Sequence, residues 1–145
     1  MAEAGTILVG IDGSDASLDA VRWAITEARR RGDRVEVLHC WHIPYYGDIT
    51  GMMPVPGQML EEAAQTVVAD TLTAVAADAA GAPAVEISGR SVQGSAAQTL
   101  IEASHGVDLV VVGRRGHGGF VGLLMGSVAT QVAGHAACPV VVVNV

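Results

Sequence analysis

Residues 107–127 read VDLVVVGRRGHGGFVGLLMGS, and this stretch decides the fold. Its first part, 107–112, is an apolar run rich in valine, which predicts a buried strand. Glycines punctuate the loop that follows, and Gly126-Ser127 stands where a helical pattern begins. A strand, a glycine-rich turn and a helix start together allow backbone N–H groups to hold a phosphate. The stretch therefore predicts an α/β fold with a nucleotide site at the end of one strand.

The rest of the chain alternates strands and helices around this stretch. Further strands are predicted at 6–11, 34–41, 84–89 and 140–145, and helices at 14–31, 58–80, from Gly94-Ser95 onward, and at 126–136. Five strands alternating with four helices indicate a doubly wound domain with a parallel sheet and right-handed crossovers, spanning 1–145. In such sheets ligands bind beyond the carboxyl ends of the strands, where the strand order reverses. If strands 6–11 and 107–112 are neighbours there, Asp12-Gly13-Ser14 and the glycine loop face one crevice.

The composition limits the classes of protein and partner. Half of the 145 residues are apolar but only 3% are aromatic, which suits a buried sheet covered by small-residue helices. The formal charge of −7 argues against nucleic acid or an anionic membrane surface as a partner. Two cysteines make neither a disulfide framework nor a zinc site. We find no signal peptide and no apolar stretch long enough to span a bilayer, so we expect a cytoplasmic protein.

The glycine loop has the residue types that a phosphate requires. Gly113 and Gly116 lack a Cβ, so successive N–H groups can turn inward and a ligand can approach the main chain. Arg114, Arg115 and His117 add local positive charge to an acidic chain. No P-loop and no G-x-G-x-x-G motif is present, so the phosphates would be held without a P-loop lysine. The alternative is a glycine-rich turn that binds no ligand.

The spacing G-x-x-G-x9-G-S, from Gly113 to Ser127, resembles the ATP-binding branch of the universal stress protein family. The resemblance also includes Ile11-Asp12-Gly13-Ser14 and the C-terminal Cys138-Pro139 with the valines after it. It implies a Rossmann-like fold of the adenine nucleotide alpha hydrolase type, with strand order 3-2-1-4-5. It further implies a homodimer formed through the strand 140–145. One departure is Ala96, where many relatives have proline.

The resemblance also implies a ligand and the residues that bind it. The ligand is ATP, with Mg²⁺ expected among the phosphate oxygens, near Asp12. Asp12 would meet the ribose hydroxyls or the metal, and the backbone of Cys40 the adenine edge. The implied binding residues are Ile11, Asp12, Ser14, Cys40, Val112, Gly113, Arg115, Gly116, His117, Gly126, Ser127 and Val128. Other roles stay open: Asp12 as a turn residue, Ser14 as a helix cap, and His117 as part of the loop surface.

Three functions remain open from the sequence. The first is an ATP-binding regulator of the stress response with little or no ATP turnover, and therefore not an enzyme. The sequence supplies no evident general base for a water nucleophile and no arginine finger on a defined helix. The second is a slow ATPase or an autophosphorylating protein that uses Ser14, Ser127 or Thr130. The third is a nucleotide-free dimeric interaction module.

Overall fold

Five parallel strands form one sheet in the order β3-β2-β1-β4-β5, which confirms the predicted fold class and strand order. The structure is a computed structural model and describes residues 3–43, 55–78, 84–115 and 125–144. The elements are β1 (Thr6–Ile11), α1 (Asp15–Arg31), β2 (Arg34–Trp41), α2 (Gly57–Asp78), β3 (Ile87–Gln93), α3 (Ala96–Ala103), the 3₁₀ turn η1 (Ser104–Gly106), β4 (Leu109–Gly113), α4 (Ser127–His135) and β5 (Val140–Val143). The order reverses between β1 and β4.

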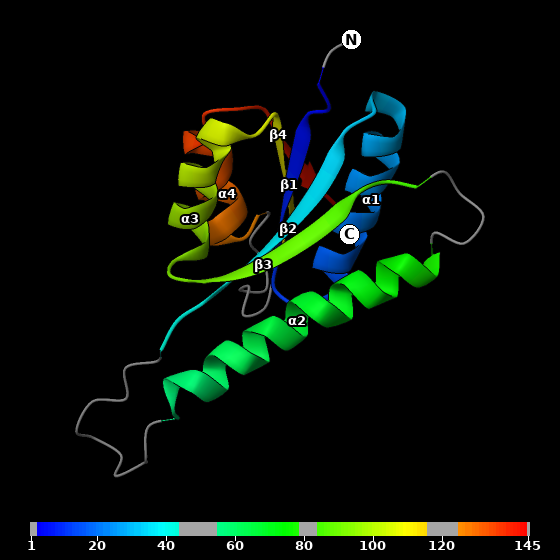
Figure 1. The fold of residues 1–145 in the computed structure, drawn as a ribbon. Helices are drawn as coiled ribbons and strands as arrows, with labels where there is room; N and C mark the ends of the chain where they lie inside the picture. The colour runs from blue at the N-terminus through cyan, green and yellow to red at the C-terminus, as the bar shows by residue number, and fades with distance from the viewer. Residues whose placement is uncertain (1–2, 44–54, 79–83, 116–124, 145) are drawn as a thin grey trace.

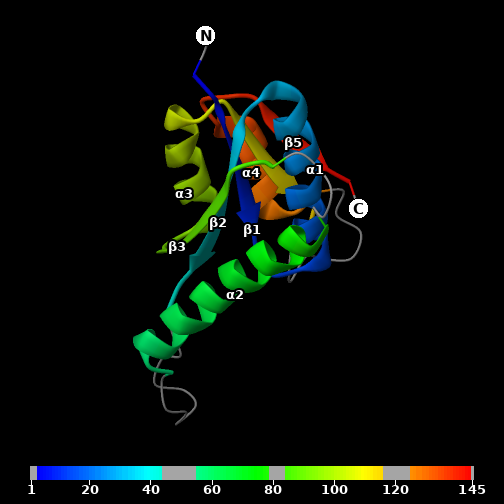
Figure 2. The same ribbon diagram turned by 45° about the vertical axis from the view of Figure 1, so that its right-hand side comes forward.

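Helices cover both faces of the sheet. Figures 1 and 2 show α1 and α2 on one face and α3 and α4 on the other. Alternate residues of β1 serve the two layers: Ile7 and Val9 pack with α1, whereas Leu8 packs with α3 and α4. All three side chains are fully buried, which explains the continuous apolar sequence of this central strand.

The third strand was predicted at 84–89, and this position is wrong: β3 is Ile87–Gln93. Within the described residues it is an edge strand paired only with β2, and much of it is exposed, so its sequence ISGRSVQ lacks an apolar run. Gly89 has a packing role, because a Cβ there would lie 2.6 Å from side-chain atoms of both Val37 and Val68. This glycine lets α2 approach the sheet closely.

The boundaries of the last two strands also differ from the prediction. β4 begins at Leu109 rather than at residue 107, because η1 and the turn after it precede the strand. Gly113 belongs to β4 and pairs with Val143 of β5. β5 ends at Val143, and Val145 lies outside the described residues. Within the described ranges, no helix combines the length and the apolar character that crossing a bilayer requires.

Candidate functional site

A cavity of about 690 Å³ opens beyond the carboxyl ends of β1 and β4, where the strand order reverses. Its volume lies within the range of small-molecule sites, roughly 300–1,000 Å³. Nine of the predicted binding residues line it: Ile11, Asp12, Cys40, Val112, Gly113, Arg115, Gly126, Ser127 and Val128. Ser14 is not among the lining residues, and Gly116 and His117 lie outside the described residues.

The turn after β1 places Asp12 at the mouth of the cavity. Gly13 adopts a left-handed conformation with φ +84°, which allows the sharp change of direction before α1. Ser14 caps that helix, since its side chain accepts a hydrogen bond from the Ser17 N–H at 3.2 Å. The Asp12 carboxylate accepts a hydrogen bond from the Ser14 N–H at 2.9 Å. Asp12 is therefore a turn residue that also lines the cavity.

The start of α4 differs from the starts of α1 and α3, which lie at the same edge. Ser14 caps α1 and Ser95 caps α3 through their side chains, whereas α4 begins after Gly126 with no side-chain cap. The first N–H groups of a helix point outward and carry partial positive charge. The Gly126 N–H donates to the Arg114 carbonyl oxygen at 2.7 Å, which fixes the position of this helix start. The α4 N-terminus is thus a place where an anion can bind.

The cavity floor is apolar and comes from the α3 and α4 side of the sheet. Leu38, Leu100 and Val112 belong to the same buried cluster and line the cavity. Gly10 also lines it, and a Cβ at this position would lie 2.8 Å from Leu100 Cδ1. An apolar floor with polar groups at one end suits a ligand that has a flat apolar part and a charged part.

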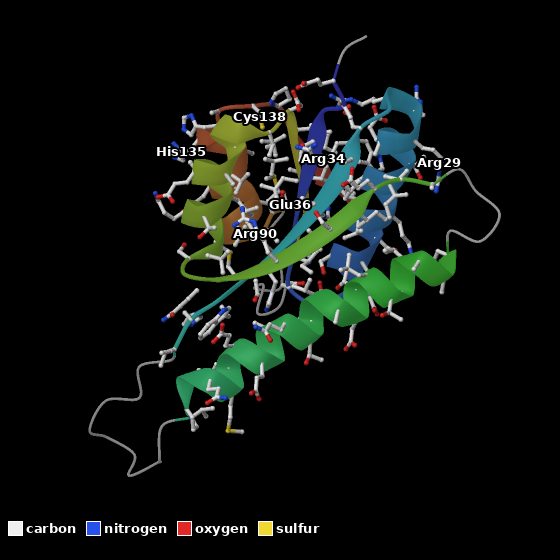
Figure 3. All side chains as sticks on the ribbon, viewed as in Figure 1. Arg29, Arg34, Glu36, Arg90, His135 and Cys138 are labelled. Atoms are coloured by element: carbon white, nitrogen blue, oxygen red, sulfur yellow. The ribbon has the colours of Figure 1, made fainter. Side chains whose placement is uncertain are left out.

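Cys40 lies half-buried in the wall of the cavity. Burial raises the pKa of its thiol, and contact with Thr99 and the positive charge of Arg90 oppose only part of this rise. Figure 3 shows Arg90 beside Glu36, and their side chains pair at 2.6 Å across β3 and β2. His39 has a structural role, because its Nδ1 donates to the Ile11 carbonyl oxygen at 2.9 Å.

Several lining residues were not among the predicted binding residues: Gly10, Ser17, Leu38, His42, Gly94, Ser95, Ala96, Leu100, Arg114 and Ala129. Two signals pointed to some of them. Gly94-Ser95 follows a strand and therefore reaches the same edge of the sheet as the glycine loop. Gly10 and Leu38 stand in strands at positions that face α3 and α4, but only the packed structure shows that they also line the cavity.

Comparison with known proteins places this chain in a family. A sequence model of the Universal stress protein family matches residues 3–144. The chain belongs to the universal stress protein family. A universal stress protein of Mycolicibacterium smegmatis is 39% identical over 138 residues, which cover 95% of this chain and 45% of the relative. This universal stress protein chain thus spans about half the length of the curated relatives it matches.

Solved universal stress proteins share the fold. One, crystallised in complex with cAMP, is 27% identical with a TM-score of 0.70, and the match covers 96% of each chain. Another, from Archaeoglobus fulgidus in complex with dAMP, is 22% identical with a TM-score of 0.66. That match covers 95% of this chain and 96% of the other. Adenine nucleotides therefore bind to proteins of this architecture.

The described residues contain no group of three or more His, Cys, Asp and Glu side chains arranged to hold a metal ion. Asp12 is the predicted ligand that lies in the cavity. One carboxylate is a suitable partner for Mg²⁺ that also binds phosphate oxygens, because this ion commonly takes one or two carboxylates with substrate phosphates. Magnesium near Asp12 stays a prediction.

Proposed function

We propose that this universal stress protein domain binds ATP in the cavity and acts as a nucleotide-dependent regulator in the stress response. The uncapped start of α4, beside two arginines and an apolar floor, is the observation that carries the proposal. A relative at 27% identity that binds cAMP supports an adenine nucleotide as the class of ligand.

The cavity has an apolar part and a polar end, and this arrangement sets the orientation of the ligand. The base and sugar lie against Ile11, Val112 and the wall at Cys40, at the apolar part of the cavity. The phosphates lie at Ser127 and Val128, where the N–H groups of the first turn of α4 can donate to them. Asp12 lies on the β1 side and is placed for the ribose hydroxyls or for Mg²⁺.

Calorimetric titration tests the ligand. We expect ATP to bind to the purified chain with about one site per copy, and Mg²⁺ to strengthen the binding. Mass spectrometry of the natively purified protein provides an independent observation, because a retained adenine nucleotide would appear there. A chain that binds neither ATP nor any other adenine nucleotide would overturn the proposal.

We further propose that the domain turns over little or no ATP. Two of the three hydroxyl groups considered as phosphate acceptors already have partners. Thr130 Oγ1 donates to the Gly126 carbonyl oxygen at 2.9 Å, and Ser14 Oγ pairs with the Asp12 carboxylate. Ser127 is the hydroxyl that lines the cavity. Incubation with γ-labelled ATP is expected to give neither labelled protein nor turnover above solution hydrolysis, and stable label on Ser127 would favour autophosphorylation instead.

The outer edge of β5 supports a homodimer as part of this proposal. β5 is the last strand of the sheet and pairs with β4 alone, and Val140–Val143 are only partly buried. An apolar edge strand without charge or proline is suited to pairing with a second copy. Light scattering of the intact chain is expected to give the mass of a dimer, and a monomer at working concentration would contradict this part of the proposal.

A further inference from the structure

Trp23 of α1 is a large apolar residue that the fold leaves 37% exposed. The buried stripe of this helix includes Ala20, Ala24 and Ala28, which belong to the core between α1 and the sheet. Aromatic surface in contact with water is unfavourable, and tryptophan is enriched in protein interfaces. Single exposed apolar residues are nevertheless common, so the surroundings of Trp23 decide what its exposure means.

Trp23 lies on the flank of α1 that faces away from α2. Arg22 is on the other flank, where it pairs with Asp78 of α2 at 2.7 Å. Successive helical residues are about 100° apart, so Arg22 and Trp23 lie on either side of the exposed crest of the helix. In the sheet, α2 lies over β2 and β3, whereas α1 also contacts β4 and β5. The flank with Trp23 therefore faces the β5 border of the sheet.

This border of the sheet is apolar and carries balanced charges. Figure 2 shows β5 close to α1, and Val141 and Val143 of this strand pack against the core beneath the helix. All four residues of β5 are only partly buried, and within the described residues the strand pairs with β4 alone. Glu27 and Arg30, which share the flank with Trp23, pair with each other at 3.6 Å. The flank and the strand edge thus offer one apolar surface with no excess charge.

Twofold symmetry determines where Trp23 lies when two copies pair through β5. Two identical edge strands that pair antiparallel are related by a twofold axis perpendicular to the sheet. Rotation about this axis keeps each face of the sheet on its own side. Both α1 helices then lie on the same face of the joined sheet, and the flanks that carry Trp23 point toward each other.

The space between the two α1 helices of such a dimer requires a large side chain. Neighbouring strands are about 4.8 Å apart, so the β4 strands of the two copies are about 14 Å apart. Since α1 lies over β1 and β4, the helix axes are at least roughly this far apart, which exceeds the spacing of about 8–10 Å between helices in direct contact. Small side chains would leave the joined β5 strands open to water, whereas a tryptophan from each copy can cover them.

We infer that Trp23 anchors an interface formed by this flank of α1 and the edge of β5, and that the partner is a second copy of this chain. This inference rests on the homodimer of the proposed function and goes beyond it, because it assigns the face of the sheet and the residue that hold the copies together. In the dimer each Trp23 covers the valines of the joined edge and contacts the flank of the other α1. Association buries aromatic and aliphatic surface and leaves the ion pair of Glu27 and Arg30 at the rim.

Sedimentation equilibrium of Trp23→Ala tests the inference, with Met59→Ala as a matched control. Met59 is also a large exposed apolar residue, 58% exposed, but it belongs to α2 at the opposite border of the sheet. Trp23→Ala is expected to raise the dissociation constant of the dimer at least about tenfold, because tryptophans at the centre of an interface contribute much of its affinity. Trp23→Phe keeps an aromatic ring and should lie between Trp23→Ala and the unmodified chain. Met59→Ala should dimerise as the unmodified chain does.

Tryptophan fluorescence separates an interface role from a role in folding. The chain has two tryptophans, so Trp41→Phe leaves Trp23 as the only one. Dilution of this variant from dimer to monomer should shift the emission to longer wavelength and increase quenching by acrylamide, because Trp23 becomes more exposed to water. Far-ultraviolet circular dichroism of the Trp23→Ala monomer should match that of the diluted unmodified chain, since a residue that is over one-third exposed contributes little to the core.

The outcomes also separate this inference from the homodimer itself. If the unmodified chain dimerises and Trp23→Ala dimerises equally well, or if the emission of Trp23 does not change on dissociation, the inference is wrong and the homodimer stands. If the unmodified chain is a monomer at every concentration, the homodimer is wrong and the inference falls with it.

Discussion

The parallel strands begin at one end of the sheet, the amino edge, and finish at the other, the carboxyl edge, and the two differ in how completely side chains of the protein satisfy their polar groups. At the amino edge, side chains of the protein satisfy the backbone: Asp33 accepts from the Gly5 N–H at 2.9 Å, and Asp108 accepts from the Thr6 N–H at 2.8 Å. Ser104 Oγ accepts from the Ala137 N–H at 2.8 Å in the same region. At the carboxyl edge, α4 has no side-chain cap and the Nε of Arg114 has no partner within the described residues. The side chains at the amino edge serve stability, and the carboxyl edge is where we propose that a ligand binds.

The largest expected effect comes from placing a charge at the carboxyl edge. Ser127→Asp puts a carboxylate at the first turn of α4, where the account places a phosphate. At an effective dielectric constant of about 20, like charges about 4 Å apart repel by roughly 4 kcal/mol, so ATP affinity should fall at least about 100-fold. The same carboxylate should raise the stability of the ligand-free protein by about 0.3–1 kcal/mol through the helix dipole.

Gln58→Asp provides the control for this substitution. Gln58 is exposed in the first turn of α2, which contains no acidic residue. Calorimetry should show unchanged ATP affinity. Urea unfolding should show a smaller gain in stability than for Ser127→Asp, because the new carboxylate also repels Glu62, which Gln58 contacts at 3.4 Å. If Ser127→Asp binds ATP as well as Gln58→Asp does, the phosphate does not lie at the start of α4.

The next effect concerns the amino edge and appears in stability alone. Ser104 is 1% exposed, and its hydroxyl also donates to the Ile101 carbonyl oxygen. Ser104→Ala leaves the Ala137 N–H without its partner and should lower the free energy of unfolding by about 1–3 kcal/mol. Urea unfolding measures this loss, with Ser88→Ala on exposed β3 as a control that should change little. A loss of ATP affinity in folded Ser104→Ala would contradict the separation of the two edges.

A smaller effect distinguishes a glycine that serves a ligand from one that serves the backbone. Gly126 has φ −71°, an angle that any residue adopts, so Gly126→Ala should cost less than about 1 kcal/mol in stability. Its added Cβ would crowd the phosphate and weaken ATP binding about tenfold. Gly134→Ala in the same helix meets no atom within 4 Å and should stabilise the protein without changing affinity. If calorimetry gives normal ATP affinity for Gly126→Ala, this glycine serves the turn before α4 and not the ligand.

The smallest effect compares the two thiols. Cys40 lines the cavity, whereas Cys138 lies before β5 at the amino edge, and Figure 3 shows it beside the end of α4. Burial raises the pKa of both thiols, so both should react slowly with iodoacetamide at pH 8 and faster as the pH rises beyond 9.0. Saturating ATP should slow the labelling of Cys40 a few-fold and leave Cys138 unchanged, as mass spectrometry of labelled peptides can show. If ATP slowed the labelling of both cysteines equally, it would act by stiffening the whole protein and not by covering Cys40.

The sequence predicted the centre of the fold better than its borders. β1 and β4 are buried on both faces, and their unbroken apolar runs made them easy to identify. β3 lies at an edge, where exposure removes that signal, so its predicted position was wrong. The length and register of an edge strand depend on the strand that it pairs with, and the local sequence does not show this pairing.

Residues of the candidate site that belong to a sequence motif could be predicted. Residues that reach the site only through packing of distant elements could not. Gly113, Gly126 and Ser127 stood out by spacing and line the cavity. Gly10 and Leu100 come from distant elements, and their closeness follows from the packing of α3 on the sheet. The sequence indicated Arg114 only as a source of positive charge in the loop, and the structure places it among the residues that line the cavity.

Amide hydrogen exchange with and without ATP tests the contrast between the edges most directly. We expect ATP to slow exchange at residues 126–129, at the start of α4. Residues 5–6, 108 and 137 at the amino edge should exchange as they do without ATP. Protection of the amino edge alone, or no change at the start of α4 in a chain saturated with ATP, would contradict the claim that the carboxyl edge is the nucleotide site.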